Sequence, residues 1–330
     1  MSRFRVVIAD FITDAMLPER EILGDVAEIV SLGASREEEL CGHVENADAL
    51  MIYHNIAISE RTISQLRQCK LIIRCGVGFD NVACAAARAC GIPVANVPDY
   101  GTEEVADSAI GLMLALTRGI ALLNRRLQRH AGEWSYMQAV PLSRLRGRAF
   151  GIIGLGRIGT AAALRAQALG MDVVFYDPYV RDGYDKALGI RRVETLEELW
   201  PQVFVLSLHC PLTEETRHIV DARALAAMPR GCYLVNTSRG ATVDTAAIPD
   251  AIRRGHLAGA GIDVLPSEPP PPDDPLVVAW RDPNDPCHDR VILNPHAAFY
   301  SEEGLLEIRV KAARTVRRAL LGEPIRNVVN

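Results

Sequence analysis

One stretch of this chain, residues 148–177, constrains the fold more than any other. It reads RAFGIIGLGRIGTAAALRAQALGMDVVFYD. A short apolar run, Phe150–Ile153, has the character of a buried parallel strand and leads directly into six residues of the pattern G-x-G-x-x-G. An alanine-rich helical segment and a second apolar run, Val173–Tyr176, follow. This order of strand, glycine turn, helix and strand predicts a βαβ unit that binds a dinucleotide.

Each glycine of the turn has a steric role in such a unit. Gly154 permits the tight turn, Gly156 lets a pyrophosphate approach the backbone at the positive end of the helix, and Gly159 lets that helix pack against the strand. Asp177 comes 18 residues after Gly159, where a carboxylate accepts hydrogen bonds from ribose hydroxyls and repels a 2′-phosphate. The glycine motif alone is also typical of an ordinary turn, but the complete arrangement indicates a dinucleotide site and favours NAD over NADP.

Strands and helices alternate along the chain in two series. The first series has expected strands at 5–9, 26–31, 49–53, 71–74 and 94–97, with helical segments at 36–44, 60–68 and 82–90. The second has strands that begin at Phe150 and continue at 173–176, 203–208, 233–236, 261–264 and 291–293. This alternation predicts the α/β class, with two doubly wound parallel-sheet domains.

Three further segments complete the organisation. Thr102–Thr117 has helical periodicity and is expected to bridge the two domains. Ser301–Leu321 is a second helix whose basic residues, Arg309 among them, are expected to form a solvated face; if it returns to the first domain, that domain is discontinuous. Pro266–Arg290 is rich in proline, so we expect a long surface loop without regular structure.

Composition excludes several classes of function. The chain has 330 residues, of which 49% are hydrophobic and 23% charged, as in ordinary two-domain globular proteins. Its net charge of −5 argues against direct nucleic-acid binding, and no apolar run is long enough to span a membrane. The eight cysteines are scattered without C-x-x-C spacing, and the start, MSRFRVVIAD, does not have the pattern of a signal peptide. We therefore expect reduced thiols, no metal site and a cytoplasmic location.

Three polar residues of the second series lie just beyond the ends of strands, where α/β sheets bind ligands. They are Arg239, Glu268 and His296. The planar guanidinium of an arginine suits a substrate carboxylate or carbonyl, and a histidine exchanges protons near neutral pH. A neighbouring glutamate fixes the tautomer of such a ring and stabilises its protonated form. Each residue alone has an ordinary structural interpretation, but together, beside a dinucleotide site, they are the groups that hydride transfer needs.

Several motifs give the chain a family resemblance. They are RCGVGFDN (74–81), GLGRIG (154–159), FYDPY (175–179), LHCPLTEETRHIV (208–220), LVNTSRGATVD (234–244), GIDVLPSEP (261–269) and NPHAAFYSEE (294–303). In content and order they resemble the D-isomer-specific 2-hydroxyacid dehydrogenase family over essentially the whole chain. Within it, the chain is most similar to the C-terminal-binding protein branch, whose animal members are NAD(H)-responsive transcriptional corepressors.

The resemblance implies a Rossmann NAD-binding domain over residues 99–297 and a flavodoxin-like substrate domain made of residues 1–98 and 298–330. It implies that Arg239, Glu268 and His296 are catalytic. The residues it implies for NAD are Val105, Gly154, Leu155, Gly156, Arg157, Ile158, Gly159, Asp177, Cys210, Pro211, Thr216, Thr237, Ser238, Arg239, Asp263, His296 and Ala298. The residues it implies for the substrate are Arg74, Val77, Gly78, Arg239, His296 and Phe299.

Two of these residues have open alternatives. Arg74 has the alternative of an exposed charge near a strand end, and Asp263 that of a turn-stabilising aspartate. If Arg74 instead belongs to a substrate-binding loop, the backbone N–H groups of residues 76–78 can face an anion, and Arg74 adds positive charge.

The chain departs from the family pattern at two places. Phe299 stands where the corepressor branch has tryptophan, which leaves more room beside His296. Glu268 and His296 are 28 residues apart, a longer separation than the family pattern, which predicts that the proline-rich segment is an insertion over the active site. Trp280 in that segment is expected either to form an apolar lid or simply to pack in the core.

The sequence therefore predicts an NAD-dependent oxidoreductase that interconverts a 2-oxo acid and the corresponding (R)-2-hydroxy acid. The alternative is an NADH-sensing, corepressor-like module that binds proteins. A formate dehydrogenase of the same superfamily is disfavoured, since that chemistry uses glutamine in place of Glu268. The resemblance also implies a homodimer formed through the NAD-binding domain, and the apolar stripe of Arg118–Trp134, with its charged rim, suits a two-fold interface.

Overall fold

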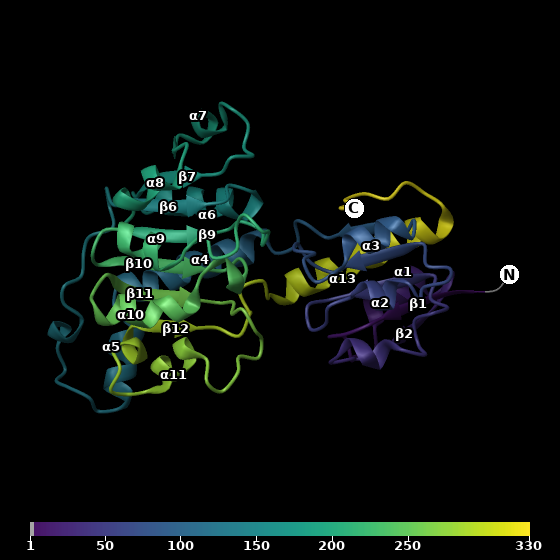
Figure 1. The fold of residues 1–330 in the computed structure, drawn as a ribbon, viewed down its shortest axis with the longest axis horizontal. Helices are drawn as coiled ribbons and strands as arrows, with labels where there is room; N and C mark the ends of the chain where they lie inside the picture. Colours follow the sequence, from purple (N-terminus) through teal and green to yellow (C-terminus); the bar gives the residue numbers. More distant parts are fainter. Residues whose placement is uncertain (1–2) are drawn as a thin grey trace. The chain divides into compact units, whose positions relative to one another are not determined.

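The structure, a computed structural model, describes residues 3–330 as two compact units (Figure 1). Unit 1 comprises the chain up to Gly101 together with Ser301–Asn330, and unit 2 is Thr102–Tyr300. Each unit has its own parallel sheet with helices packed on it. This confirms the predicted α/β class with two doubly wound sheets.

Unit 1 contains a five-stranded parallel sheet in the order β2-β1-β3-β4-β5. Its strands are β1 (Phe4–Ile8), β2 (Ala27–Ser31), β3 (Ala49–Ile52), β4 (Leu71–Arg74) and β5 (Val94–Asn96). Its helices are α1 (Leu17–Leu23), η1 (Glu37–Leu40), α2 (Glu60–Ile63), α3 (Cys84–Ala89) and α13 (Glu302–Leu321). The strands β3 and β4 are buried along their whole length, as expected for apolar strands covered on both faces. The strand order reverses between β1 and β3, so ligands are expected at the carboxyl ends of these strands.

Two predicted helices of unit 1 are much shorter than expected. Over 36–44 only the 3-10 turn η1 forms, because the chain breaks at Gly42, whose φ of 84° is left-handed. Over 60–68 the helix α2 ends at Ile63, since the Arg67 N–H is hydrogen-bonded to the Glu45 carbonyl at 3.0 Å instead of continuing the helix. Tertiary contacts therefore override the local helical pattern in both places.

Unit 2 contains a seven-stranded parallel sheet in the order β12-β11-β10-β9-β6-β7-β8. Its strands are β6 (Ala149–Ile153), β7 (Asp172–Tyr176), β8 (Arg191–Arg192), β9 (Val205–Leu208), β10 (Cys232–Asn236), β11 (Leu257–Ile262) and β12 (Val291–Leu293). The strand order reverses between β6 and β9, and the glycine turn follows β6 at that point.

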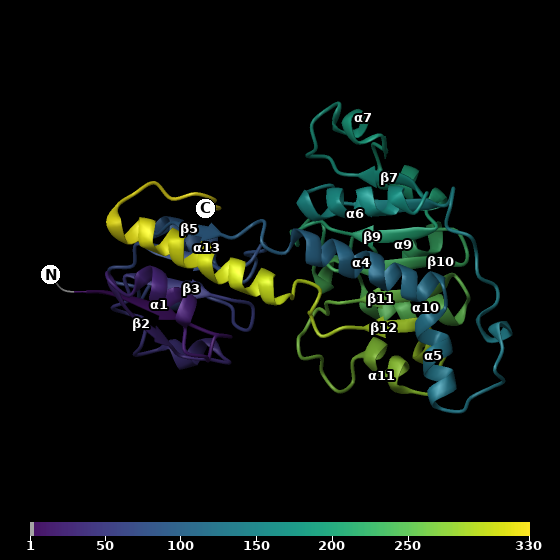
Figure 2. The ribbon, with the colours of Figure 1, turned by 180° about the vertical axis from the view of Figure 1, so that it is seen from behind.

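The helices α4 and α6 lie side by side on one face of this sheet (Figure 2). The helices of unit 2 are α4 (Thr102–Thr117), α5 (Ile120–Gln128), η2 (Tyr136–Ala139), α6 (Arg157–Ala168), α7 (Tyr184–Leu188), α8 (Leu196–Leu199), η3 (Trp200–Gln202), α9 (Ala222–Ala227), η4 (Gly240–Thr242), η5 (Thr245–Ala247), α10 (Ile248–Arg253), α11 (Pro275–Arg281) and α12 (Cys287–Arg290). No single helix in the described chain is long and apolar enough to cross a membrane; α4 and α5 pass only as a pair, bent by 64°.

The prediction of a structureless loop over Pro266–Arg290 is wrong in its second half. α11 begins with Pro275 after Asp274, whose carboxylate accepts a hydrogen bond from the Val277 N–H at 3.0 Å. Trp280, on the same helix, packs against the hydrophobic core of unit 2. Of the two roles considered for Trp280, core packing is therefore the one the structure favours.

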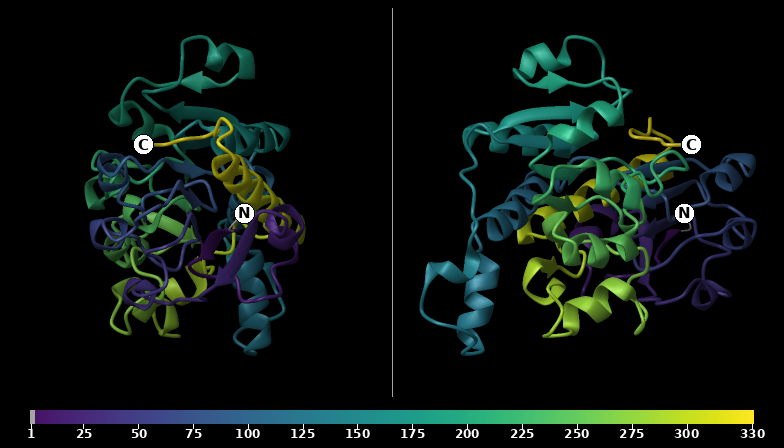
Figure 3. Two further views of the ribbon diagram at one scale, coloured as in Figure 1. Left: turned by 90° about the vertical axis from the view of Figure 1, so that its right-hand side faces the viewer. Right: turned by 60° about the vertical axis from the view of Figure 1, so that its left-hand side comes forward.

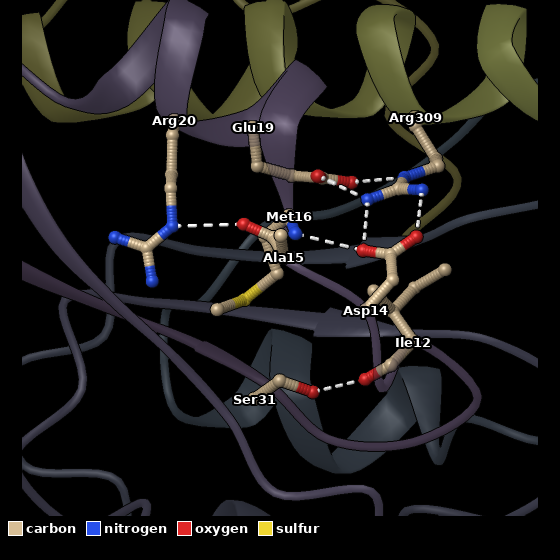
Figure 4. A network of polar contacts seen from close by, with 8 residues as sticks. All are labelled: Ile12, Asp14, Ala15, Met16, Glu19, Arg20, Ser31 and Arg309. Carbon is tan, nitrogen blue, oxygen red and sulfur yellow. Dashed lines mark hydrogen bonds and ion pairs between the residues drawn. The ribbon is translucent and has the colours of Figure 1, made fainter.

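An ion-pair network centred on the buried Arg309 joins α13 to α1 (Figure 4). Arg309 donates to both carboxylate oxygens of Glu19, each at 2.7 Å, and to those of Asp14 at 2.6 and 2.9 Å. Glu19 is fully buried and Arg309 is 7% exposed. The expected solvated basic face of this helix is thus wrong for Arg309. The pairing explains the burial, because a buried charge needs a partner that satisfies its hydrogen bonds.

The last residues of the chain extend unit 1 at its sheet edge. Val329 N–H donates to the Val94 carbonyl at 2.8 Å, and the Val94 N–H donates to the Asn330 side chain at 2.8 Å. Together with α13, which runs along this unit in Figure 2, these contacts make the carboxyl-terminal segment an integral part of unit 1.

We predict that Arg309→Ala lowers the free energy of unfolding of unit 1 by about 3–5 kcal/mol, because Glu19 becomes an unpaired buried carboxylate. Urea denaturation followed by circular dichroism measures this change. Arg314→Ala, an exposed site on the same helix, is the control and should change stability by less than about 0.5 kcal/mol. Equal losses for the two variants would contradict the role of the network.

The same prediction has a pH dependence. Hydrogen bonding from Arg309 lowers the pKa of Asp14 in the folded protein. This ion pair therefore contributes fully above the ordinary aspartate range and is lost as pH falls through the lowered pKa. The stability difference between the parent and Arg309→Ala should accordingly shrink below about pH 4.

Candidate functional site

The glycine turn after β6 packs with no room for side chains at two of its three glycines. A Cβ on Gly154, whose φ is 90°, would lie 2.6 Å from the Cys210 backbone nitrogen. A Cβ on Gly159 would lie 2.1 Å from the Gly154 carbonyl oxygen. At Gly156, in contrast, a Cβ would meet no protein atom within 4 Å. The turn is therefore tight where it touches the protein and open at the residue expected to face a pyrophosphate.

Asp177 connects this turn to the strand β7. Its carboxylate accepts hydrogen bonds from the Leu155 N–H at 2.8 Å and the Tyr179 N–H at 2.9 Å, one on each oxygen. Because each carboxylate oxygen can accept a second bond, the side chain can still receive ribose hydroxyls. Asp177 thus holds the glycine turn as well as lying at the predicted ribose position.

The residues around the turn fit a bound dinucleotide. The first N–H groups of α6 lie beside the open space at Gly156, and a helix N-terminus favours a phosphate. The Thr237 hydroxyl, in the turn after β10, is buried and has no hydrogen-bond partner among the described residues. A group in this state indicates a missing partner, as a ligand would supply.

Other residues predicted for NAD lie in the same unit. Val105 is buried on the first turns of α4, and Ser108 on the same helix donates to the Ala298 carbonyl at 3.1 Å. Burial raises the pKa of the Cys210 thiol to about 12, so this cysteine is a packing residue and not a nucleophile. Pro211 and Thr216 belong to one turn, where the Thr216 hydroxyl donates to the Pro211 carbonyl at 2.6 Å.

The loops after β10 and β11 meet through another glycine. A Cβ on Gly240 would lie 1.9 Å from the Leu265 carbonyl carbon and 2.3 Å from the Pro266 nitrogen. Only glycine permits this approach, which brings the loop of Arg239 against the loop of Glu268. The Arg239 guanidinium donates to the Ser238 carbonyl at 2.9 Å, and Arg239 is half-buried.

Glu268 and His296 form a direct pair. The Nδ1 atom of His296 lies 2.6 Å from Glu268 Oε2, while Glu268 Oε1 accepts the Leu265 N–H at 2.8 Å. The glutamate is thereby oriented by its own loop, and it in turn orients the ring. With Nδ1 engaged in this way as the donor, Nε2 is the ring atom that can exchange a proton with a substrate. Phe299 lies edge-on to the same ring, with centroids 6.2 Å apart.

Asp263 fixes the backbone that carries His296. Its Oδ1 accepts the N–H groups of Ala297 and Ala298 at 2.9 and 3.0 Å, and its carbonyl accepts the His296 N–H at 2.8 Å. His296 itself has a left-handed φ of 52°, an unusual conformation for a residue other than glycine. Burial raises the pKa of the Asp263 carboxyl, and the two N–H groups oppose that shift. The turn-stabilising role considered for Asp263 is therefore present in the structure.

Arg74, Val77 and Gly78 lie in unit 1, at the carboxyl end of β4. Arg74 is 6% exposed, so the alternative of an exposed charge is wrong. Its guanidinium donates to the Cys75 carbonyl at 2.8 Å and occupies the place of a Cβ on Gly76, which would lie 1.4 Å from Nη1. The Gly76 N–H is used within the loop, in a bond to the Arg74 carbonyl at 2.9 Å. The N–H groups of Val77 and Gly78 are therefore the ones this loop can offer to an anion.

Two residues at the same edge of unit 1, Asp10 and Phe11, were not predicted from the sequence. Asp10 is fully buried and accepts the N–H groups of Tyr53 and Asn55 at 2.7 and 2.8 Å, so it joins the loops after β1 and β3. Burial raises its pKa. Phe11, with a left-handed φ of 68°, stacks on Tyr53 at 5.2 Å and contacts His54 at 4.8 Å. The only sequence signal was an aspartate directly after the first strand.

Across residues 3–330, no group of three or more His, Cys, Asp or Glu side chains is arranged to hold a metal ion. The features of unit 2 define a class of protein: a Rossmann dinucleotide-binding protein with a carboxylate–histidine pair at the carboxyl edge of the same sheet.

Comparison with known proteins agrees with this class. The model of the "D-isomer specific 2-hydroxyacid dehydrogenase, NAD binding domain" matches residues 110–298, which is more than half of the chain. The chain therefore belongs to the D-isomer specific 2-hydroxyacid dehydrogenase family, and its nucleotide cofactor is NAD.

Individual relatives extend the comparison. The chain is 36% identical to C-terminal-binding protein 1 of Caenorhabditis elegans, over 92% of this chain and 42% of that protein. It is 34% identical to D-3-phosphoglycerate dehydrogenase of Methanocaldococcus jannaschii, over 94% of this chain and 57% of that protein. It thus spans about half the length of these curated relatives. Among solved structures, D-lactate dehydrogenase of Aquifex aeolicus with NAD and lactic acid matches with a TM-score of 0.83, 27% identity and 96% coverage of both chains.

We predict that Asp177→Asn increases the affinity for NADPH relative to NADH about tenfold or more, because it removes the charge that repels a 2′-phosphate. Asparagine keeps an oxygen that can accept the Leu155 N–H, so the turn should be retained. Fluorescence titration with each nucleotide measures the ratio. Asp172→Asn, an exposed carboxylate at the other end of β7, is the control; the same nucleotide ratio in both variants would refute the assignment.

Proposed function

We propose that the protein is an NAD-dependent oxidoreductase that interconverts a 2-oxo acid and the corresponding (R)-2-hydroxy acid. The observation that carries the proposal is the 2.6 Å pair of Glu268 and His296 at the carboxyl edge of the sheet that also bears the glycine turn. The pair and the dinucleotide turn belong to the same compact unit, which supports the proposal because hydride transfer requires an acid–base group near the cofactor. Unit 2 is then the NAD-binding domain and unit 1 the substrate domain.

In the reducing direction each proposed residue has one task. Bound NADH supplies the hydride that C2 of the substrate receives. His296 donates the proton from Nε2 to the developing alkoxide, and Glu268 stabilises the protonated ring through Nδ1. Arg239 holds the substrate carboxylate or carbonyl oxygen with its planar guanidinium. In unit 1, Arg74 and the N–H groups of Val77 and Gly78 are the groups that offer positive potential to a carboxylate.

The family supports this assignment. A family model named for 2-hydroxyacid dehydrogenases and a structural neighbour named for D-lactate both support a small 2-hydroxy acid as substrate.

We propose that Phe299 helps to select the substrate side chain, because it lies edge-on to the His296 ring and is smaller than the tryptophan of the corepressor branch. We also propose a cytoplasmic location, in which the eight unpaired cysteines remain reduced.

A screen of 2-oxo acids of varied chain length and charge with NADH tests the function directly. We expect turnover of at least one class of 2-oxo acid.

We predict that Phe299→Trp lowers kcat/KM for bulky 2-oxo acids about tenfold more than for glyoxylate or pyruvate, because the larger ring fills the pocket. NADH oxidation at 340 nm is the measurement. Tyr184→Trp, an exposed aromatic on α7 of unit 2, is the control. If Phe299→Trp changes all substrates by the same factor, Phe299 does not read the side chain.

The second candidate function is an NADH-sensing module that binds proteins. It is supported by the 36% identity to C-terminal-binding protein 1. The two candidates differ in one measurable respect, since the module needs NADH binding but no turnover. Tight NADH binding without oxidation by any 2-oxo acid in the screen would favour the module and refute the enzyme.

We predict that Glu268→Gln moves the upper pH limit for 2-oxo acid reduction to lower pH. Reduction needs the protonated His296 ring, and a neutral amide stabilises that cation less than a carboxylate does. Steady-state kinetics across pH 5–9 measure the limit, while His296→Ala should lose most turnover and still bind NADH. Glu214→Gln, an exposed glutamate of unit 2, is the control. A profile for Glu268→Gln that coincides with the control would exclude the glutamate from this role.

We further propose a homodimer formed through unit 2. Beyond α4, apolar side chains are exposed in succession: Ile120, Leu127, Trp134, Tyr136, Met137 and Val140. α5 stands at the margin of the unit (Figure 3), and Arg126 and Arg129 hold it to α12 through Asp289 at 2.7 Å each. A hollow of about 900 Å³ lies beside α5, lined by Ala139–Leu142 and the amino ends of β6 and β10. An exposed apolar segment next to a hollow suits association with a second copy.

We predict a dimer in sedimentation equilibrium at micromolar concentration, and a shift toward monomer for Trp134→Ala with Met137→Ala, because these side chains supply exposed apolar area. Leu164→Ala, an exposed leucine on α6, is the control. A monomeric parent protein would refute the proposal.

A further inference from the structure

A hydrogen bond between a tyrosine and a glutamate connects two separate loops at the carboxyl edge of the unit 2 sheet, near the glycine turn. The Tyr179 hydroxyl donates to Glu215 Oε2 at 2.7 Å. Tyr179 follows β7, while Glu215 belongs to the turn after β9. In the sheet these two strands lie on either side of β6. The hydrogen bond therefore spans from one neighbour of the glycine turn to the other.

The contacts of these loops form a closed circuit around the carboxyl end of β6. On one side, Gly154 packs against the backbone of Cys210, where the turn that carries Glu215 begins. On the other side, the Leu155 N–H is bound to Asp177, which also accepts the Tyr179 N–H. The bond between Tyr179 and Glu215 closes the circuit. The space inside it is bordered by the turn and by the acid expected to hold the adenosine ribose.

The two anchors of this circuit are held independently. In the turn after β9, the Thr216 hydroxyl donates to the Pro211 carbonyl at 2.6 Å and accepts the Thr213 N–H at 2.8 Å. After β7, Arg192 donates to the Val180 carbonyl at 3.1 Å. The Tyr179 and Glu215 side chains, in contrast, are exposed, with Tyr179 at 78%. The hydrogen bond between them is consequently the part of the circuit that opens most readily.

We propose that Tyr179 and Glu215 are positioning residues that close the adenosine compartment of the NAD site and set the rate at which the cofactor enters and leaves. The pair closes the compartment in the free protein, opens for adenosine to pass, and closes again behind it. The inference rests on NAD as the cofactor and not on the reaction. Hydrogen bonding to Glu215 raises the pKa of the Tyr179 phenol, so the hydroxyl remains a donor at neutral pH.

Stopped-flow fluorescence of NADH binding tests the proposal without any substrate. We expect Tyr179→Phe and Glu215→Gln each to raise both the association and the dissociation rate constants about threefold to tenfold, with Kd nearly unchanged, because one hydrogen bond no longer has to break in either direction. The double variant should match the single variants, since each alone already removes the bond. ADP-ribose, used as a competitor, should show the same acceleration, and reduced nicotinamide mononucleotide, which lacks adenosine, should show none.

The controls are a nearby tyrosine and a nearby glutamate that take no part in the hydrogen bond between Tyr179 and Glu215. Tyr184→Phe changes another tyrosine in the segment between β7 and β8, and Glu214→Gln changes the exposed carboxylate that precedes Glu215. Both should leave the rate constants as in the parent protein. Rate constants unchanged in Tyr179→Phe and Glu215→Gln would overturn the proposal. An increase in the dissociation rate alone would also overturn it, because the side chains would then hold adenosine directly instead of gating it. A parent protein that binds no NADH would refute the cofactor assignment itself.

Discussion

Unit 2 depends on direct contact between backbones at the carboxyl edge of its sheet. Gly154 against Cys210 and Gly240 against the Leu265–Pro266 peptide leave no space for a Cβ. The first contact shapes the dinucleotide turn, and the second brings the loop of Arg239 to the loop of Glu268. Backbone contacts have few degrees of freedom, so they position loops more rigidly than long side chains can. The same device therefore organises both halves of the candidate site.

Carboxylates supply the second level of organisation, and most of them bind backbone N–H groups. Asp177 holds the glycine turn, Asp263 holds residues 297 and 298, and Asp10 holds the loop after β3. Each lies just after a strand and binds N–H groups of the loop that follows a neighbouring strand of the sheet. Glu268 differs, since one oxygen binds its own loop and the other binds His296. The Glu268–His296 pair thus uses the same kind of carboxylate-to-backbone contact as these aspartates and adds a contact to a side chain.

The sequence predicted what depends on local order, and it missed what depends on distant partners. The strands, the glycine turn and the polar residues Arg239, Glu268 and His296 could be predicted because each depends on a run of a few residues. The structure confirmed the fold class. The burial of Arg309 was missed because its partners Asp14 and Glu19 lie almost 300 residues earlier, and helical periodicity alone places a basic residue in solvent. Asp274-Pro275 did contain a helix start, but the surrounding prolines concealed it. The left-handed Phe11 had no sequence signal at all.

The Arg309 network also bears on the order in which the chain can fold as it is synthesised. Glu19 is synthesised before unit 2, whereas the Arg309 guanidinium that neutralises it is synthesised 290 residues after Glu19, once unit 2 is complete. All of unit 2 is made between these two events, and domains generally fold as units once their residues are available. Unit 2 can therefore fold first, while the five-stranded sheet awaits α13 with an acidic residue still open to water. The strands β1–β5 are synthesised before unit 2 but thus reach their final structure after it.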